Sequence, residues 1–580
     1  MSARVNDVRE AASFVDARSL VPDDVERRIP HDRLQRLSNI VEQSGICDQL
    51  TEWRAADNAS SHRGGRPAAI GDHGILIVLL ALAVEGRPLY VSEAADIIEH
   101  RLDDEGRNML GIHQHAADSD RWYDRTWRAV HRLLDVIDPY PALRRTIGVS
   151  EDEYSRLLAE RTALGADLKV GRLNWFANQL IDLTWLTLPR PVRRRWKGNI
   201  CIDATPMQAF AKPRTQFRLR TSEPDAAWYV RTGDHRDPGD ASGEKVKRSM
   251  FGYEVHIAVA TPNTDNIHSP DFPLLATGIA VDKPGHNVAE SAMIVLSSMA
   301  DRNFYPAVAV GDRAYWSNSK AEKLQLPARA LGWQNVNDYT KGQLGMQTGH
   351  GGGIQVEGAW YCPSMPQPLI DATIDHRNKA ISDDDYAGRI EQRRRYLLKA
   401  KERPDADGHQ PLRCPAVGKS ATVACPLRDS GTPVRIGLTK IHTPPKHPDR
   451  ICTQTSVSFP PTAGAKYRQD AHYGSADWHK RYSVARNTIE GLNGYVKVGP
   501  EQLAAPERRR IRGRTAQHVL AALLIAAANI RKIRTWLDHA EIIDDEPHTP
   551  GHIKQRATSR KRRASLREHL PPPTGEPPGS

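Results

Sequence analysis

The order of short apolar runs after residue 198 constrains the fold of this chain more than any other feature of the sequence. Up to about residue 195 the apolar residues recur with helical periodicity, whereas beyond 198 they fall in short runs rich in β-branched residues. We expect strands over residues 199–203, 253–260, 274–281 and 307–310, and a helix over residues 288–300 that precedes the last of these strands. This order predicts a mixed α/β sheet flanked by helices.

With 580 residues, the chain is too long for one hydrophobic core, and its composition suggests several regions. We expect a helical N-terminal region over residues 1–195, an α/β domain in two parts over 198–330 and 466–540, an irregular Gly- and Pro-rich insertion over 331–465, and a basic, Pro-rich, disordered tail over 541–580. A basic helix is expected within the insertion over residues 385–403, and longer helices follow over 474–497 and 515–536.

The charge balance and the apolar runs restrict the surroundings of the protein. Lys and Arg total 81 against 70 Asp and Glu, and the net charge of +11 favours a polyanionic partner. The longest apolar run, Ile75–Val84, is about half as long as a membrane helix requires. The N-terminus lacks the apolar stretch of a secretion signal, and the six cysteines are scattered. We therefore expect a cytoplasmic protein without structural disulfides and without a membrane partner.

Two short helices joined by a glycine-containing turn are expected around residue 85. The first covers Ile70–Val84, the segment Glu85–Pro88 breaks it, and Ser92 is the expected N-cap of a second helix that continues to Arg101. Such a pair resembles a helix-turn-helix, which places its second helix in the major groove of DNA. The alternative is a helical hairpin that packs within the protein and binds nothing.

A further helix is expected to begin where aromatic and basic residues alternate, over residues 121–128. This composition suits base stacking and phosphate contact. In the alternative interpretation, Trp122, Val130, Leu133 and Leu134 fill a core while the arginines are solvated. For the tryptophans we favour the core.

Two of the expected strands end in an aspartate. Asp203 follows the apolar pair Cys201-Ile202, and Asp312 follows Val310-Gly311. An acid at the tip of a buried strand is costly unless a cation compensates its charge. One such aspartate commonly caps a turn, but two on neighbouring strands point to a shared site.

A third acid lies on the helix expected over residues 474–497. At about 100° per residue, Arg486 and Lys497 lie within about 40° of Glu490 on the helix surface, so the three side chains share one face. Taken alone, Arg486 and Glu490 would form a surface ion pair worth about 0.2–0.5 kcal/mol. Taken with the two strand-end aspartates, they indicate an acidic site with basic partners.

These motifs together resemble the DDE transposases of bacterial insertion sequences. Asp203-Ala204-Thr205 is similar to the Asp-x-Thr context of the first acid of that family, and Asp312-Arg313-Ala314-Tyr315 to the Asp-x-Gly-Tyr context of the second, with Ala in place of Gly. Arg486-x3-Glu490-x6-Lys497 matches the third signature in full spacing, while Tyr482 stands four residues before the arginine instead of three. The resemblance covers about residues 198–540, including the expected insertion.

The resemblance implies an RNase H-like catalytic domain, which opens with three strands, a helix and a further strand. It implies that Asp203, Asp312 and Glu490 hold two Mg²⁺ or Mn²⁺ ions, because clustered carboxylates repel one another unless divalent cations neutralise them. The residues implied to contact DNA or its phosphates are Arg486, Lys497, Tyr315 and Asn493. The implied reaction is cleavage of double-stranded DNA at the ends of an element and strand transfer into target DNA, carried out by a homodimer in the nucleoid.

Two other function classes stay open: a noncatalytic DNA-binding protein descended from a transposase, and an RNase H-like nuclease that cuts without joining. Asp282 and Asp301 are second choices for the metal site, since both stand in turn contexts where aspartate makes local hydrogen bonds. His256 and His286 flank the expected sheet, and we interpret them as structural histidines.

Four cysteines, Cys362, Cys414, Cys425 and Cys452, lie in the expected insertion. Four thiolates could form a tetrahedral zinc site, but the spacings of 51, 10 and 26 intervening residues include no Cys-x2-Cys knuckle. We therefore expect reduced, buried cysteines rather than a structural zinc.

Overall fold

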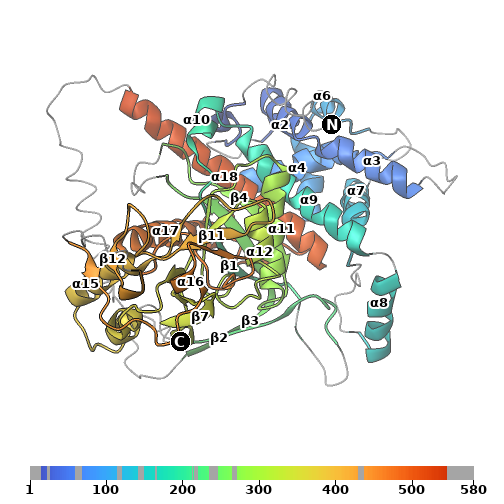
Figure 1. Ribbon diagram of the computed structural model, residues 1–580. Helices are drawn as coiled ribbons and strands as arrows, with labels where there is room; N and C mark the ends of the chain where they lie inside the picture. The colour runs from blue at the N-terminus through green and yellow to red at the C-terminus, as the bar shows by residue number, and fades with distance from the viewer. Residues whose placement is uncertain are drawn as a thin grey trace. The chain divides into compact units, whose positions relative to one another are not determined.

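The computed structural model describes residues 15–22, 27–58, 68–113, 121–140, 149–163, 166–211, 213, 220–233, 246–263, 271–428 and 437–544 (Figure 1). Contacts group the chain into two units, residues 1–534 and 535–580, and the architecture below is that of the first unit. The predictions for the tail beyond residue 544 lie outside the described residues.

Helices dominate the described residues before 196, as the sequence predicts. They are α2 (His31–Gln43), α3 (Ile46–Asn58), α4 (Asp72–Val84), α5 (Val91–Asp96), α6 (Asp104–Met109), α7 (Trp122–Ile137), α8 (Glu151–Ala163), α9 (Ala166–Trp185) and α10 (Arg190–Arg195). Residues 74–84 of α4 are all buried, because every side of the helix beyond its first turn is apolar.

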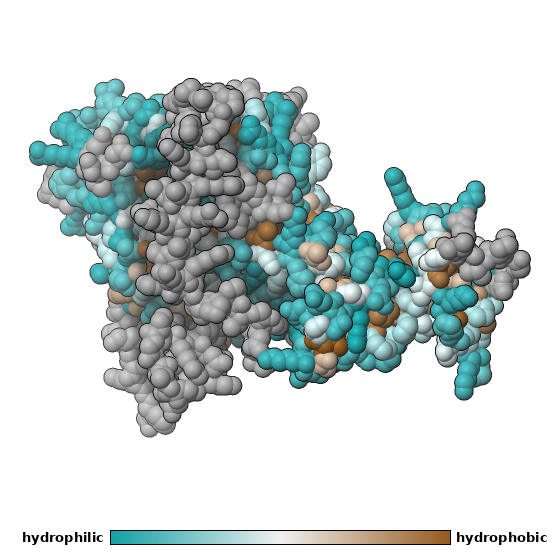
Figure 2. Space-filling model, turned by 90° about the vertical axis from the view of Figure 1, so that its left-hand side faces the viewer, coloured by the Kyte–Doolittle hydropathy of each residue, from teal (hydrophilic) through white to brown (hydrophobic). Residues whose placement is uncertain are grey.

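The surface of the described residues is consistent with the burial of apolar side chains inside the protein. None of the described helices is long and apolar enough to cross a membrane. The described side chains on the face drawn in Figure 2 are mostly hydrophilic, with apolar residues in small separate areas.

The helical hairpin expected around residue 85 is present. α4 ends at Val84 and α5 begins at Val91, and a π-helical turn over Ile97–Arg101 follows. Tyr90 occupies the N-cap position of α5 and makes no side-chain cap, so the prediction of Ser92 as N-cap is wrong.

The accessible side of this second helix is acidic. Glu93 and Asp96 lie 2.5 and 3.4 Å from the Arg87 guanidinium, and Glu99 and His100 are exposed near the end of the hairpin. DNA phosphates repel carboxylates, but cations also lie at the start of this helix, where the Arg510 guanidinium is 4.7 Å from the centre of the Tyr90 ring. The hairpin is present, and DNA reading by its second helix stays a prediction.

The helix that begins near residue 121 supports the core interpretation of its tryptophan. Trp122, Val130, Leu133 and Leu134 of α7 are all buried. Arg121 and Arg128 are exposed, as that interpretation expects, whereas Arg125 is only 7% exposed and its guanidinium lies 4.9 Å from the centre of the Trp122 ring. Stacking on an aromatic face lowers the cost of burying that cation.

A six-stranded sheet carries the second part of the fold. Its strands are β1 (Ile200–Gln208), β2 (Ala227–Gly233), β3 (Val246–Ala260), β4 (Ala276–Asp282), β5 (Val308–Gly311) and β6 (Gln334–Asn337), and α11 (Val288–Asp301) connects β4 to β5. The order is β2-β3-β1-β5-β6, with β4 also paired to β3. β1 is antiparallel to β3 and parallel to β5, and β6 is parallel to β5. The predicted mixed α/β sheet flanked by helices is confirmed.

Helices cover both faces of this sheet, and the strand registers assign a helix to each face. Asp203 pairs with Ile257, which pairs with Ile279, so these three side chains point to the same face. Side chains of α17 (Ala476–Val498) contact Asp203, so α17 covers that face. Gly278 faces the other way, where a Cβ would lie 2.9 Å from Val295 of α11. The site therefore forms on the α17 side.

Side-chain amides from two helices satisfy the backbone of β4. Asn178 of α9 accepts the Ile279 N–H and donates to the Ile279 carbonyl, both at 2.9 Å. Asn529 of α18 (Arg514–Asp544) makes the same pair of bonds with Ala276, also at 2.9 Å. Because an exposed row of backbone groups invites pairing with another chain, these amides close β4 as an edge.

Short elements make up the region expected as an insertion, and two expectations there need correction. β6 pairs with β5, so the sheet extends past the expected boundary at residue 330. The helix expected over residues 385–403 is α15 (Asp383–Arg393), which ends ten residues early at a 3-10 turn. The other elements are β7 (Met346–His350), β8 (Gly353–Val356), β9 (Ala359–Tyr361), α13 (Gln367–Ile370), α14 (Ala372–Arg377), β10 (Lys399–Ala400), β11 (Gln410–Arg413), β12 (Val423–Ala424), β13 (Thr439–Lys440), α16 (Arg450–Thr453) and β14 (Val457–Phe459).

A buried histidine on α18 predicts acid sensitivity. Burial lowers the pKa of His518 to about 3, and the nearby Arg514 cation lowers it further. Since the unfolded value is about 6.5, the unfolded chain binds the proton first, and stability is lost as pH falls from about 6.5 toward 3. His518→Leu is expected to reduce the slope of unfolding free energy against pH in this window by up to about 1.4 kcal/mol per pH unit.

The measurement is chemical denaturation at a series of pH values. His100→Gln, at an exposed position, is the control and should leave the slope unchanged. An unchanged slope in the His518→Leu protein would show that His518 titrates normally and that its burial is not maintained.

Candidate active site

Two of the three predicted acids meet at one end of the sheet. In the parallel pairing of β1 with β5, the last paired residues are Ile202 and Gly311, so the next step of the register brings Asp203 beside Asp312. The Asp203 side chain is 15% exposed. The backbone N–H of Ala314 donates to Asp312 Oδ1 at 2.9 Å and fixes that carboxylate in the turn after β5.

The two aspartates disfavour each other's charge. Burial raises the pKa of the Asp312 carboxyl, and the negative charge of Asp203 raises it further. The Arg486 guanidinium and the backbone N–H groups of Ala314 and Tyr315 oppose this shift. A carboxylate pair under such repulsion gains stability when a cation is added between its members.

Helix α17 brings a cation and an amide onto this pair. Arg486 Nη1 lies 3.3 Å from Asp203 Oδ1, and Arg486 Nη2 donates to Glu490 Oε1 at 3.2 Å. Asn493 Nδ2 donates to Asp203 Oδ2 at 3.3 Å. The shared helix face predicted for Arg486 and Glu490 is present, and Arg486 also bridges to the strand-borne acid, which a simple surface pair does not do.

The third acid is the most accessible of the three. The Glu490 side chain is 59% exposed, while the side chains of Arg486 and Asp203 are 20% and 15% exposed. Glu490 therefore stands at the entrance of the site, where a large substrate can reach it. Lys497 lies on the same helix face, half-buried, next to the last residue of α17.

Tyr315 is not presented to solvent, unlike the phosphate contact that the resemblance implies. It is 1% exposed, and its hydroxyl lies 2.8 Å from His256 Nδ1. Burial lowers the pKa of His256 to about 4, so its ring is neutral at pH 7 and accepts the Tyr315 proton. These observations agree with a structural role for His256, while His286 is exposed in the turn after β4.

Sequence reasoning missed one acid beside the site. Burial raises the pKa of Glu254 on β3, and the charges of Asp312, Asp203 and Asp282 raise it further. The backbone N–H of Gly285 donates to Glu254 Oε2 at 2.9 Å. The sequence signal for this acid is its position inside an otherwise apolar, alternating strand.

The two acids that were second choices for the metal site, Asp282 and Asp301, lie in different surroundings. Asp282 pairs with Arg514 at 3.2 Å and accepts a hydrogen bond from Asn287 at 3.1 Å. Asp301 is the exposed last residue of α11. Neither observation favours replacing Asp203 or Asp312.

The acids carry the oxygen donors that hard divalent cations prefer, but the structure does not arrange them as a metal site. Among the described residues, no three His, Cys, Asp or Glu side chains are arranged as a metal-binding group. The Arg486 guanidinium lies between Asp203 and Glu490, and its positive charge offsets the repulsion between these two carboxylates. Asn493 Oδ1 is buried without a hydrogen-bond partner and adds an unused oxygen donor.

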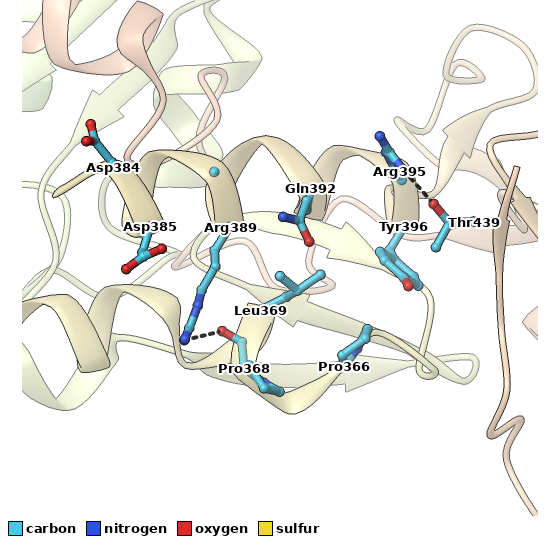
Figure 3. Close-up of a pocket in the computed structure, with 11 residues that line it drawn as sticks. Pro366, Pro368, Leu369, Asp384, Asp385, Arg389, Gln392, Arg395, Tyr396 and Thr439 are labelled. Carbon is cyan, nitrogen blue, oxygen red and sulfur yellow. Dashed lines mark hydrogen bonds between the residues drawn. The ribbon is translucent and has the colours of Figure 1, made fainter. Parts of the chain in front are cut away.

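A separate pocket of about 430 Å³ is lined by residues of the chain segment that connects β6 to α17 (Figure 3). Arg389 Nη1 donates to the Pro368 carbonyl at 3.2 Å, and Arg395 Nη1 to Thr439 Oγ1 at 2.9 Å. None of the site carboxylates lines it, and its mixed acidic and basic rim favours no single ligand.

Comparison with protein-family models, with curated proteins and with solved structures finds no significant match to this chain.

Proposed function

We propose that this protein is a DDE-type transposase that cleaves the ends of a DNA element and transfers them into target DNA. The observation that carries the proposal is the junction of Asp203 and Asp312 on neighbouring parallel strands, covered by a helix with the Arg486–Glu490 pair. The sheet order β4-β3-β1-β5-β6, with β1, β5 and β6 parallel and β3 antiparallel to β1, supports an RNase H-like catalytic domain.

The acids Asp203, Asp312 and Glu490 would hold two Mg²⁺ or Mn²⁺ ions. When bound, such ions supply activation of a water or DNA 3′-hydroxyl and stabilisation of the leaving oxygen. Asn493 orients the Asp203 carboxylate, and Arg486 holds Asp203 and Glu490 together. Because Glu490 is the exposed acid, DNA reaches the site over that face of α17.

The partner would be double-stranded DNA, bound in the nucleoid by a homodimer that holds two element ends. The net charge of +11 supports a polyanionic partner. The test uses purified protein and a DNA fragment carrying the sequences that flank the reading frame, incubated with Mg²⁺ and, in parallel, without it. We expect nicked ends and, with pre-cut ends, joined products. Binding without nicking would instead support a noncatalytic DNA-binding protein, and cutting without joining an RNase H-like nuclease.

Two glycines on α17 test whether DNA approaches this helix. A Cβ on Gly491 or Gly494 would meet nothing within 4 Å, so neither glycine serves packing within the protein. At about 100° per residue, Gly494 lies some 40° from Glu490, and Gly491 about 100° away. Each change to alanine should stabilise the helix by about 0.5–1 kcal/mol.

Gly494→Ala is expected to weaken DNA binding in addition, since its methyl group faces the approaching backbone, while Gly491→Ala should stabilise equally and bind normally. Melting temperature and DNA affinity by fluorescence anisotropy are the two measurements. Equal DNA affinities in the two variants would mean that DNA does not approach this side of α17.

A further inference from the structure

Four cysteines that are far apart in the sequence lie near one another within the chain segment that connects β6 to α17. The thiols of Cys362 and Cys414 form a hydrogen bond with each other. Cys414 and Cys425 both lie close enough to Cys452 for their negative charges to raise the pKa of its thiol, after burial has raised it. Cys425 also packs against the small core that contains Cys362. All four are free thiols in the structure.

Three of these cysteines stand in the same local turn. Each is followed by a proline, and each sulfur accepts the backbone N–H of the residue after that proline, which is Ser364, Ala416 or Leu427. The recurring turn gives three of the four cysteines the same local backbone geometry.

The backbone connects the segments that carry the cysteines. The Thr422 N–H donates to the Pro415 carbonyl at 3.0 Å, joining the Cys414 turn to the strand before Cys425. Arg428 donates to the carbonyls of Ile451 and Thr453 at 3.3 Å, joining the Cys425 turn to α16, which carries Cys452. Arg428 also donates to Cys414, so a cation already lies at the cluster.

The strands and apolar clusters around the cysteines are small. β10, β12 and β13 have two residues each, and the two local hydrophobic clusters contain nine and six buried residues. Small units with so little core generally need disulfides or a metal ion for stability.

We propose that Cys362, Cys414, Cys425 and Cys452 bind one zinc ion, which cross-links this region. Four thiolates are a common ligand set for a structural zinc site, and zinc binding releases the thiol protons to solvent. Since the described residues form no closed metal-binding group, binding draws Cys425 and Cys452 toward the Cys362–Cys414 pair. Arg428 offsets part of the negative charge that four thiolates leave around a divalent ion. This inference does not depend on the proposed DNA chemistry.

The test begins with the full-length protein purified without chelators. Elemental analysis should find about one zinc per chain, as expected for one four-thiolate site. Replacing zinc with Co²⁺ should give the intense visible absorption of a tetrahedral cobalt–thiolate centre. Cys425→Ser and Cys452→Ser should each lose the metal, whereas Cys47→Ser, on α3, should retain it.

The wild-type protein also gives a result that does not depend on how the variants fold. Stripping zinc with a chelator should lower the melting temperature, and adding zinc back should restore it. Asp312→Asn should keep its zinc in full, which separates this site from the carboxylates. A folded, zinc-free protein with four reactive thiols, or with a Cys362–Cys414 disulfide found by peptide mapping, would overturn the proposal.

Discussion

Asp312→Asn is expected to lower the rate of DNA cleavage by at least about 10³-fold while DNA affinity stays at the wild-type level. Metal-ligand carboxylates support several kcal/mol of transition-state stabilisation, and each factor of ten in rate corresponds to about 1.4 kcal/mol. The asparagine has nearly the same shape but no charge. Cleavage is measured on a labelled fragment with Mg²⁺, and affinity on the same fragment without metal.

The same variant should not be less stable than the wild type. Burial and the nearby Asp203 disfavour the ionised Asp312, as its raised pKa shows. The folded state therefore loses stability as pH rises through that pKa, and a neutral asparagine removes this loss. In metal-free buffer at pH 7 we expect an equal or higher melting temperature. Added Mg²⁺ should raise the melting temperature of the wild type only.

Asp301→Asn is the matched control, because Asp301 is exposed at the end of α11. It should cleave at the wild-type rate. If Asp312→Asn retained cleavage, another acid would fill the site, and Glu254 would be the first to examine because its charge interacts with both aspartates.

Glu85→Ala is expected to lower the free energy of unfolding by about 3–5 kcal/mol, the largest stability effect that we predict. The Glu85 side chain is fully buried after α4 and binds two buried arginines. Arg33 Nη1 lies 3.0 Å from Oε1, and Arg101 Nη1 lies 2.7 Å from Oε2. Alanine would leave two guanidinium groups side by side, out of water and without their shared anion.

The control for this change is Glu99→Ala, at a half-exposed side chain that lies 4.0 Å from the exposed His100. It should alter stability by less than about 0.5 kcal/mol. Denaturant midpoints of the two variants give the comparison. Similar midpoints would mean that the Glu85 cluster is solvated in the folded protein.

Much of the fold could be predicted where the signal is local. The four expected strands and the helix before the last of them overlap β1, β3, β4, β5 and α11, although β1 ends five residues later and β3 begins seven residues earlier than expected. β6 was missed because its sequence, Gln-Asn-Val-Asn, is polar. Asn335 and Asn337 are nevertheless buried, since Asn335 donates to the Arg468 carbonyl at 3.1 Å and Gln469 accepts the Asn337 N–H at 3.3 Å. Those partners lie about 130 residues away and leave no trace in the local pattern.

The candidate site also combines features that local spacing predicts with features that depend on distant residues. Helical spacing alone placed Arg486 beside Glu490, because positions on one helix have a fixed geometry. It did not show that Arg486 also reaches Asp203 or that Glu254 lies near both aspartates. The four cysteines of the expected insertion are free thiols, as predicted, but their spacing did not show that the fold brings their segments near one another.

The sequence by itself determined the alternation of helices and strands, the two strand-ending aspartates and the shared face of Arg486 and Glu490, because each depends on neighbours within one element. The tertiary structure decided that the aspartates lie side by side, that α17 covers them, and that Tyr315 faces His256 instead of solvent. These contacts join residues from 59 to 290 positions apart. Their geometry is set by sheet register and helix packing, which arise only when distant segments bury their apolar faces against each other.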